Sequence, residues 1–305
     1  MARGRRLFGV ALVLIGLPVP VVLVEAVSFY TRNRDTGTMV SSGEPRGYLL
    51  YVPRSYDPSR PTPLVISLHA AGLWGAAQEK TSQWNRVAER AGVIVAYPSG
   101  LGEHGIRIWR VEQGPGLARD VRFIADLIDT LAAHYNIDRT RVYANGLSNG
   151  GGMSFVLSCA LSDRIAAVGL VAAAQTLPWS WCTDQHPVPM IAFHGTADAF
   201  VPYNGGKVWL APEPFPNVPQ WAANWARRNH CAPTPVDSLV AADVSRRVYT
   251  HCAADATVEL FTIRGGGHSW PGGTPLPQWF VGKTSTSIDA SNVMWEFFRD
   301  HPLRH

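Results

Sequence analysis

The chain has 305 residues, of which 46% are hydrophobic and 16% are charged, and its formal net charge is +4. This is the composition of an ordinary globular protein that can bury a sizeable core. Part of the positive charge lies at the N-terminus, and no Lys/Arg-rich binding motif follows, so we expect no nucleic-acid partner.

The first predicted element is a targeting segment over residues 1–30. Arg3, Arg5 and Arg6 precede an uncharged apolar run from Leu7 to Val24, which is typical of an exported protein. The run is long for a signal-peptide core and near the lower limit for a membrane span, so a cleaved signal peptide and a membrane anchor both stay open. We expect the remainder to be extracytoplasmic, with membrane contact only through this segment if it is uncleaved.

Residues 31–45 are polar and contain Gly and Ser, and we interpret them as a linker to a catalytic domain over residues 46–305. In that domain, apolar runs of strand length alternate with amphipathic stretches of helix length. The predicted strands are Tyr48–Val52, Leu64–His69, Val93–Tyr97, Val142–Gly146, Ala166–Val171, Met190–His194 and Val258–Ile263. The predicted helices are Gln78–Ala91, Ala118–Tyr135 and Asn292–Arg299. This alternation indicates an α/β fold with a mostly parallel sheet and helices on both faces.

The four cysteines, Cys159, Cys182, Cys231 and Cys252, show no Cys-x-x-Cys spacing. In an exported chain an even number of cysteines favours disulfides over metal ligands. Three connectivities are open. We prefer Cys159 with Cys182 and Cys231 with Cys252, because these pairings close short loops. Buried free thiols are the alternative.

Gly146-Leu147-Ser148-Asn149-Gly150 lies between a predicted strand and a stretch of helical character. A serine on such a strand-to-helix turn projects its hydroxyl, and the flanking glycines leave room where side chains would clash. The pattern predicts a nucleophile elbow with Ser148 as the nucleophile of acyl transfer. A pentapeptide of this kind also arises by chance, so its partners have to be found independently.

A serine nucleophile needs a histidine base, and the base needs a carboxylate that holds its tautomer. Asp198 follows the strand Met190–His194, and His268 lies on a glycine-rich loop after Val258–Ile263. The order Ser148, Asp198, His268 is that of α/β-hydrolases. Asp184 and Asp289 are alternative acids, but one precedes the required strand and the other follows the histidine. His194 is an alternative base, but its place inside a strand end favours a packed histidine.

The tetrahedral intermediate needs two backbone N–H donors. One is expected from Asn149, the residue after the nucleophile, and the other from the loop His69-Ala70-Ala71-Gly72, where we choose Ala71. The alternative is that these small residues only pack beneath the helix after the elbow.

The chain resembles the secreted esterase family that includes poly(3-hydroxybutyrate) depolymerases and feruloyl and acetylxylan esterases. The resemblance covers residues 45–300 and is carried by His69–Gly72, Ile137–Tyr143, Gly146–Gly152, His194–Asp198 and, most specifically, Gly265–Gly273. It implies that Ser148, Asp198 and His268 are nucleophile, acid and base. Ala70 is a departure, since the family usually has glycine there.

Eleven tryptophans are many for this length. Most are expected to pack in the core and loops, and only Trp270, two residues from His268, is predicted to line the substrate site. Gly100–Gly105 matches a dinucleotide fingerprint, but the next residues alternate and open no helix, so we interpret the motif as a loop. The histidines show no metal-ligand spacing. We therefore expect neither a cofactor nor a metal.

The sequence thus predicts an exported serine esterase. The resemblance implies that its substrate is a polysaccharide-linked feruloyl or acetyl ester or a hydroxyalkanoate ester. A serine peptidase or an acyltransferase with the same triad is the nearest alternative. An alternative of another class is a non-catalytic glycan-binding module that keeps the fold.

Overall fold

The computed structural model describes residues 35–103, 106–183, 186–208, 211 and 213–304. The targeting segment expected over residues 1–30 lies outside these ranges, as do residues 31–34. Within the described ranges, no helix is long and apolar enough to cross a membrane.

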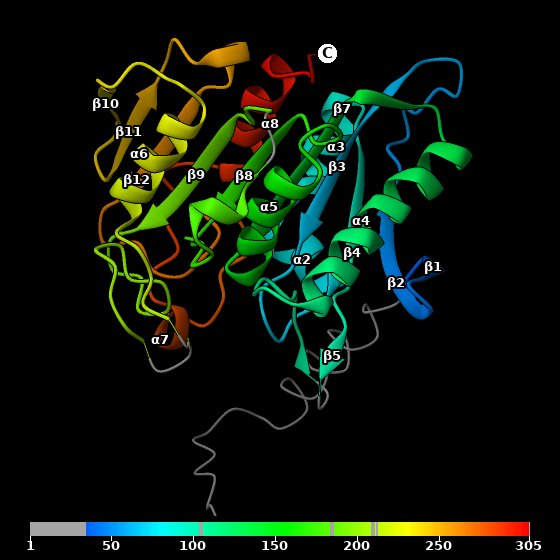
Figure 1. The fold of residues 1–305 in the computed structure, drawn as a ribbon, viewed down its shortest axis with the longest axis horizontal. Helices are drawn as coiled ribbons and strands as arrows, with labels where there is room; N and C mark the ends of the chain where they lie inside the picture. The colour runs from blue at the N-terminus through cyan, green and yellow to red at the C-terminus, as the bar shows by residue number, and fades with distance from the viewer. Residues whose placement is uncertain (1–34, 104–105, 184–185, 209–210, 212, 305) are drawn as a thin grey trace, which may run out of the picture. The chain divides into compact units, whose positions relative to one another are not determined.

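A ten-stranded sheet organises the described residues (Figure 1). Its order is β1-β2-β4-β3-β7-β8-β9-β12-β11-β10. The six strands from β4 to β12 in this order run parallel, and the strands outside them pair antiparallel. The strands are β1 (Gly37–Ser41), β2 (Glu44–Tyr51), β3 (Thr62–Leu68), β4 (Ile94–Pro98), β7 (Ile137–Leu147), β8 (Ala167–Val171), β9 (Met190–Gly195), β10 (Val236–Ala241), β11 (Val244–Tyr249) and β12 (Val258–Ile263).

Helices cover both faces of this sheet (Figure 1). One face packs against α4 (Pro115–His134), α5 (Asn149–Ala160) and α6 (Val218–Arg228). The other packs against α3 (Trp84–Ala91) and α8 (Ala290–Asp300). The remaining elements are α2 (Gly75–Ser82), α7 (Gln278–Val281), the 3-10 turns Trp179–Trp181 and Ala253–Asp255, and the small hairpin of β5 (Gly102–Glu103) and β6 (Ile106–Arg107).

The pattern of β3 shows why its residues form a central strand. Leu64, Ile66 and Leu68 pack into the cluster beneath α4 and α5, whereas Val65 packs into the cluster on the opposite face. Successive side chains of a strand point to opposite faces, so a strand covered on both sides needs apolar residues almost throughout. The predicted mostly parallel sheet with helices on both faces is confirmed.

Three expectations differ from the structure. Residues 37–51 form the β1–β2 hairpin where part of a linker over residues 31–45 was expected. The single helix predicted over Gln78–Ala91 is two helices, because Gln83 adopts a left-handed conformation with φ of 59° between α2 and α3. The antiparallel strands β10 and β11 were not predicted, since most side chains of β10 are exposed and carry no apolar pattern.

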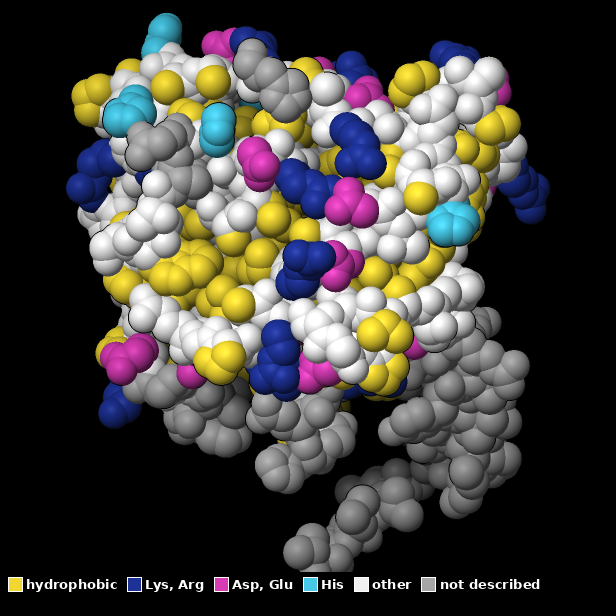
Figure 2. All heavy atoms as spheres, turned by 45° about the vertical axis from the view of Figure 1, so that its right-hand side comes forward, with side chains coloured by type: hydrophobic (Ala, Val, Ile, Leu, Met, Phe, Trp, Pro, Cys, Tyr) yellow, Lys and Arg dark blue, Asp and Glu magenta, His cyan; other side chains and the backbone are white. Residues whose placement is uncertain are grey.

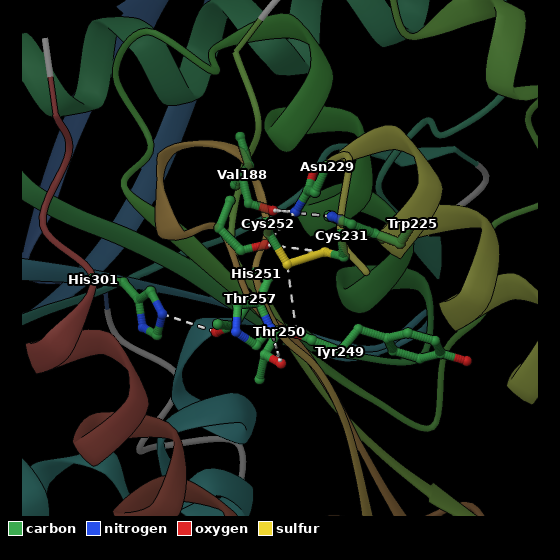
Figure 3. Close-up of a disulfide and its surroundings, with 11 residues drawn as sticks. Val188, Trp225, Asn229, Cys231, Tyr249, Thr250, His251, Cys252, Thr257 and His301 are labelled. Atoms are coloured by element: carbon green, nitrogen blue, oxygen red, sulfur yellow. Dashed lines mark hydrogen bonds between the residues drawn. A yellow bond between two sulfur atoms is a disulfide. The ribbon is translucent and has the colours of Figure 1, made fainter. Parts of the chain in front are cut away.

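Both preferred disulfides are present, Cys159 with Cys182 and Cys231 with Cys252. The second joins residues that follow α6 and β11, beside Val188 (Figure 3). The side chains of Trp225 and Asn229 both donate to the Val188 carbonyl, at 2.9 and 2.8 Å. These bonds fix α6 at the amino end of β9, the end opposite Asp198.

Positive and negative side chains are interspersed on the face that carries α4 (Figure 2). Asp129 of α4 pairs with both Arg164 and Arg139, and Asp126 pairs with Arg122 one turn earlier. This face is therefore not a basic stripe of the kind that binds nucleic acid.

Candidate active site

Ser148 lies on a sharp turn between β7 and α5. Its φ of 55° and ψ of −118° fall in a region that residues with side chains rarely adopt. The turn is held on both sides: the Ser148 N–H donates to the Val171 carbonyl, and the Ser148 carbonyl accepts from the Gly152 N–H, both at 2.9 Å. A strained serine between a strand and a helix is the geometry of a nucleophile elbow.

The glycines two residues before and after Ser148 are required by close backbone approach. A Cβ on Gly146 would lie 2.3 Å from the Gly150 carbonyl carbon, and a Cβ on Gly150 would lie 2.2 Å from the Leu68 oxygen. Both distances are shorter than real side chains allow. The start of α5 is therefore pressed against the end of β3 and the loop after it.

Asp198 and His268 are joined by a hydrogen bond of 2.8 Å between Asp198 Oδ2 and His268 Nδ1. The other carboxylate oxygen, Oδ1, accepts from the backbone N–H groups of Phe200 and Val201, each at 2.9 Å. Both side chains are largely buried. Asp198 thus fixes its own turn with one oxygen and the imidazole with the other.

The loop that carries His268 is anchored to the chain that follows it. The His268 N–H donates to the Val281 carbonyl at 2.6 Å, and the Gly267 N–H donates to the Lys283 carbonyl at 2.8 Å. A Cβ on Gly195 would lie 2.2 Å from the Gly266 oxygen, so the loop also packs tightly on the end of β9. His268 is therefore held between β9 and the end of α7.

Ser148, Asp198 and His268 follow the carboxyl ends of β7, β9 and β12, which run parallel in one sheet. The carboxyl ends of parallel strands meet at one edge of the sheet, where sites of α/β proteins form. The structure joins Asp198 to His268 by a hydrogen bond and places Ser148 at the same edge.

The alternative base, His194, and one alternative acid, Asp289, are hydrogen-bonded elsewhere. The Nε2 of His194 bonds to the Val201 carbonyl at 2.8 Å and lies 3.6 Å from Asp198 Oδ2. Burial lowers the pKa of His194 below its ordinary value, so the ring is a neutral packed histidine. Asp289 caps α8 by accepting from the Asn292 N–H. Asp184 lies outside the described residues.

His69, on the loop after β3, is fully buried with both ring nitrogens engaged. Its Nδ1 bonds to the Ala70 carbonyl at 2.8 Å, and its Nε2 accepts from the Gly100 N–H at 2.9 Å. Burial, assisted by the nearby Arg107 guanidinium, lowers the pKa of His69 to about 4. A neutral imidazole therefore braces this loop from within.

The side chain of Asn149, at the start of α5, is clamped on the backbone of Trp109. Its Oδ1 accepts from the Trp109 N–H at 2.7 Å, and its Nδ2 donates to the Trp109 carbonyl at 2.9 Å. The buried Trp109 indole in turn donates to the His69 carbonyl at 3.1 Å. The two segments expected to supply backbone donors, at Asn149 and at Ala71, are thus linked through Trp109.

Residues 46–176 match the family model described as "Esterase PHB depolymerase". Feruloyl esterase B of Piromyces equi is 30% identical over 230 residues, which are 73% of this chain and 42% of that protein. The putative esterase NocK of Nocardia uniformis subsp. tsuyamanensis is 28% identical over 285 residues, 85% of this chain and 80% of that protein. Over these residues the chain is similar to that esterase family.

The solved structure of acetyl xylan esterase from Aspergillus awamori matches with a TM-score of 0.61 and 16% identity, over 83% of this chain and 94% of that chain. This likeness confirms the predicted α/β-hydrolase fold. The chain spans less than half the length of feruloyl esterase B, as stated above.

Within this esterase fold, Trp270 does not line a substrate site, so that prediction is wrong. Its side chain is 1% exposed, and its indole N–H donates to Ser291 Oγ at 3.0 Å. An aromatic ring does lie beside His268, but it is that of Phe200, which in turn contacts Phe280 of α7. Phe200 stands close to Asp198 in sequence, whereas no sequence signal connected Phe280 to His268.

The glycine motif at residues 100–105 was interpreted as a loop, and the structure describes part of it. Its described part enters the β5–β6 hairpin, and the next helix begins only at Pro115. Directly after the glycines, the described residues offer no helix N-terminus of the kind that binds a pyrophosphate. Among the residues that the structure describes, no group of three or more His, Cys, Asp or Glu side chains is arranged to hold a metal ion.

Proposed function

We propose that the protein is an exported serine carboxylic-ester hydrolase that acts through Ser148, Asp198 and His268. The observation that carries this proposal is the hydrogen bond between Asp198 and His268 at the sheet edge where a strained turn presents Ser148. The match to the esterase family supports the same reaction class.

In this mechanism His268 takes the proton of the Ser148 hydroxyl as the oxygen attacks the ester carbonyl. Asp198 accepts from Nδ1, which leaves Nε2 as the basic nitrogen and stabilises the imidazolium that forms. The imidazolium then gives its proton to the departing alcohol, and an acyl-serine remains. Water, activated by the same imidazole, releases the acid and restores the serine.

The oxyanion of the tetrahedral intermediate is held by the backbone N–H groups of Asn149 and Ala71. Asn149 is the first residue of α5, and the first N–H groups of a helix have no partner within the helix. The clamp of the Asn149 side chain on Trp109 supports a fixed direction for this N–H. Two such donors are worth several kcal/mol in acyl transfer, about 3 kcal/mol each.

The substrate class follows from the names of the relatives. A feruloyl esterase and an acetyl xylan esterase are among them, and the family model names a depolymerase. We infer a polysaccharide-linked feruloyl or acetyl ester, with a hydroxyalkanoate ester as the second choice. Both require a site open to a bulky alcohol or polymer.

The chain organisation belongs to the proposal as well. Residues 1–30 export the protein and are then cleaved or kept as a membrane anchor. The catalytic domain includes the β1–β2 hairpin and the described elements that follow it. The two disulfides support an oxidising location outside the cytoplasm.

The test is a Ser148→Ala variant assayed on 4-nitrophenyl acetate, methyl ferulate, acetylated xylan and hydroxybutyrate oligomers. We expect activity to fall by roughly 10³-fold or more and labelling by a fluorophosphonate probe to disappear. Ser162→Ala, a buried serine just beyond α5, serves as the matched control and should keep wild-type activity. A Ser148→Ala protein with full activity would refute the proposed nucleophile.

The same assay separates the rival functions. Amide substrates reveal a serine peptidase, and product analysis with added alcohol acceptors reveals an acyltransferase. A glycan-binding module would bind xylan oligosaccharides yet leave Ser148 unlabelled by the probe.

A further inference from the structure

Three aromatic side chains connect His268 to the protein surface by successive contacts. The ring of Phe200 lies 4.9 Å from the His268 imidazole, centroid to centroid, and Phe280 lies 5.1 Å from Phe200. Trp279 contacts Phe280 at 5.7 Å and is 88% exposed, while Phe280 is 57% exposed. We name Phe200, Phe280 and Trp279 the aromatic ridge.

The aromatic ridge is fixed relative to the base. Phe200 belongs to the turn that Asp198 holds through the Phe200 N–H. Phe280 and Trp279 belong to α7, whose last residue, Val281, accepts the hydrogen bond from the His268 N–H. The rings and the imidazole are therefore carried by segments that are hydrogen-bonded to one another.

Single exposed apolar residues are common on protein surfaces, but adjoining large rings that continue into a site are not. Within the described chain, most of the surface of both Trp279 and Phe280 stays exposed. Aromatic faces bind the flat, apolar faces of other rings, whether aryl or sugar. The aromatic ridge therefore has the chemistry of a ring-binding surface next to the base.

We propose that the aromatic ridge binds a ring on the alcohol portion of the ester and so determines specificity; this proposal rests on the proposed function. The reason is the direction of proton transfer. His268 must return its proton to the departing alcohol oxygen, so that oxygen lies at hydrogen-bond distance from the imidazole in the transition state. Side chains that contact the imidazole and extend to the surface then lie beside the alcohol, which extends outward.

The occupant is one ring, either the aryl ring of an aromatic alcohol or the pyranose ring of a sugar. Both present a flat apolar face, and the continuity of the aromatic ridge with His268 places that ring a few bonds beyond the ester oxygen. An unbranched alkyl alcohol offers no such face. The enzyme should therefore prefer ring-bearing alcohols over alkyl alcohols of equal acidity.

The experiment compares 3-phenylpropyl acetate with butyl acetate, whose acyl group is identical and whose alcohols have similar acidity. A second arm uses methyl 6-O-acetyl-glucopyranoside, which tests the sugar ring. The variants are Trp279→Ala, Phe280→Ala and their double variant. Leu239→Ala, an exposed apolar side chain on β10, is the matched control.

We expect kcat/KM of the double variant to fall about tenfold or more for ring-bearing esters and to stay within about twofold for butyl acetate, as loss of stacking predicts. Leu239→Ala should leave kcat/KM unchanged for both the ring-bearing esters and butyl acetate. Loss in the phenyl arm alone assigns an aryl ring, and loss in the glucoside arm alone assigns a sugar. If the double variant is active and its preference for ring-bearing esters over butyl acetate is unchanged, the proposal for the aromatic ridge is refuted and the proposed esterase function stands.

A second readout does not depend on turnover. Ligand-detected NMR measures binding of 3-phenylpropanol and methyl glucopyranoside to Ser148→Ala protein, with and without the two aromatic substitutions. If the wild type hydrolyses none of the esters, the proposed function fails. Binding that disappears with Trp279 and Phe280 would then still establish the ring site, and the absence of binding would overturn it.

Discussion

At the scale of single residues, Asp198 illustrates how one side chain performs two tasks. Oδ1 accepts two backbone N–H groups and shapes the turn, while Oδ2 accepts from His268. Asparagine can keep the first task, because its Oδ1 is also an acceptor. It fails in the second, since an amide N–H₂ facing Nδ1 selects the wrong imidazole tautomer.

We therefore expect Asp198→Asn to fold normally and to lose about 10³- to 10⁴-fold in kcat. The measurement is kcat on 4-nitrophenyl acetate together with the thermal midpoint. Asp289→Asn is the control: its oxygen caps α8, asparagine caps equally well, and kcat should stay within about twofold. An Asp198→Asn enzyme that retains a tenth of wild-type kcat would exclude Asp198 as the proposed acid.

The positions of Ser148, Asp198 and His268 at three strand ends could be predicted from sequence, because apolar strand-length runs and glycine-rich turns mark those ends. Whether an aromatic ring near the site points toward His268 or into the core could not be predicted. Trp270 is two residues from His268, yet it points into the core toward Ser291. Phe280 is twelve residues away and reaches Phe200 through α7, a contact that only the fold creates.

At the scale of elements, the turn at Ser148 depends on how closely α5 can approach β3. Gly150 and Gly152 lie one half-turn apart on the same helix but meet different surroundings. A Cβ on Gly150 would lie 2.2 Å from the Leu68 oxygen, whereas a Cβ on Gly152 would find its nearest neighbour, a Val111 methyl, at 3.6 Å. The first contact is a clash with backbone, and the second is ordinary van der Waals contact.

Gly150→Ala should therefore lower the free energy of unfolding by about 3 kcal/mol, because the backbone of β3 or α5 must shift. Gly152→Ala should raise it by about 0.5 to 1 kcal/mol, because alanine is the better helix former. Urea unfolding of both variants measures the difference. Equal stability of the two would show that the elbow tolerates a side chain at Gly150 and would contradict the close approach.

The strands of the parallel sheet could be predicted to within a few residues, since burial on both faces requires nearly continuous apolar runs. The hairpins at the two edges of the sheet, β1–β2 and β10–β11, could not be predicted in this way. Most residues of β10 are exposed, with Val236 and Leu239 among them, so β10 has no alternation to detect. The break at Gln83 also had no signal, because left-handed backbone at a glutamine is imposed by packing and not by propensity.

At the scale of the whole molecule, the amino ends and the carboxyl ends of the parallel strands have separate roles. The Cys231–Cys252 disulfide and the bonds to Val188 secure the amino end of β9. Its carboxyl end leads into the turn of Asp198. The Cys231–Cys252 cross-link therefore lies away from the candidate site. The loops of the site are held by hydrogen bonds and by buried polar groups such as His69.

That buried histidine couples folding to pH. The pKa of His69 falls from its ordinary 6.5 to about 4 on folding, chiefly through burial. Between these two values the unfolded chain binds a proton that the folded chain does not, so stability is lost as pH falls from about 6.5 to about 4. The full shift corresponds to about 3 kcal/mol, present above pH 6.5.

We expect His69→Gln to remove the pH-dependent part of the unfolding free energy that His69 contributes. The difference in unfolding free energy between wild type and variant should shrink by up to about 3 kcal/mol as pH is lowered from 6.5 to 4, as measured by urea unfolding at several pH values. Ser67→Ala, which removes a buried hydroxyl on β3 that bonds Asn145, is the control without a titrating group. Its difference from wild type should be the same at each pH. If the plots of unfolding free energy against pH are parallel for wild type and His69→Gln, His69 has the same pKa in the folded and unfolded chains. That result would refute the claim that a neutral His69 supports the Ala71 loop.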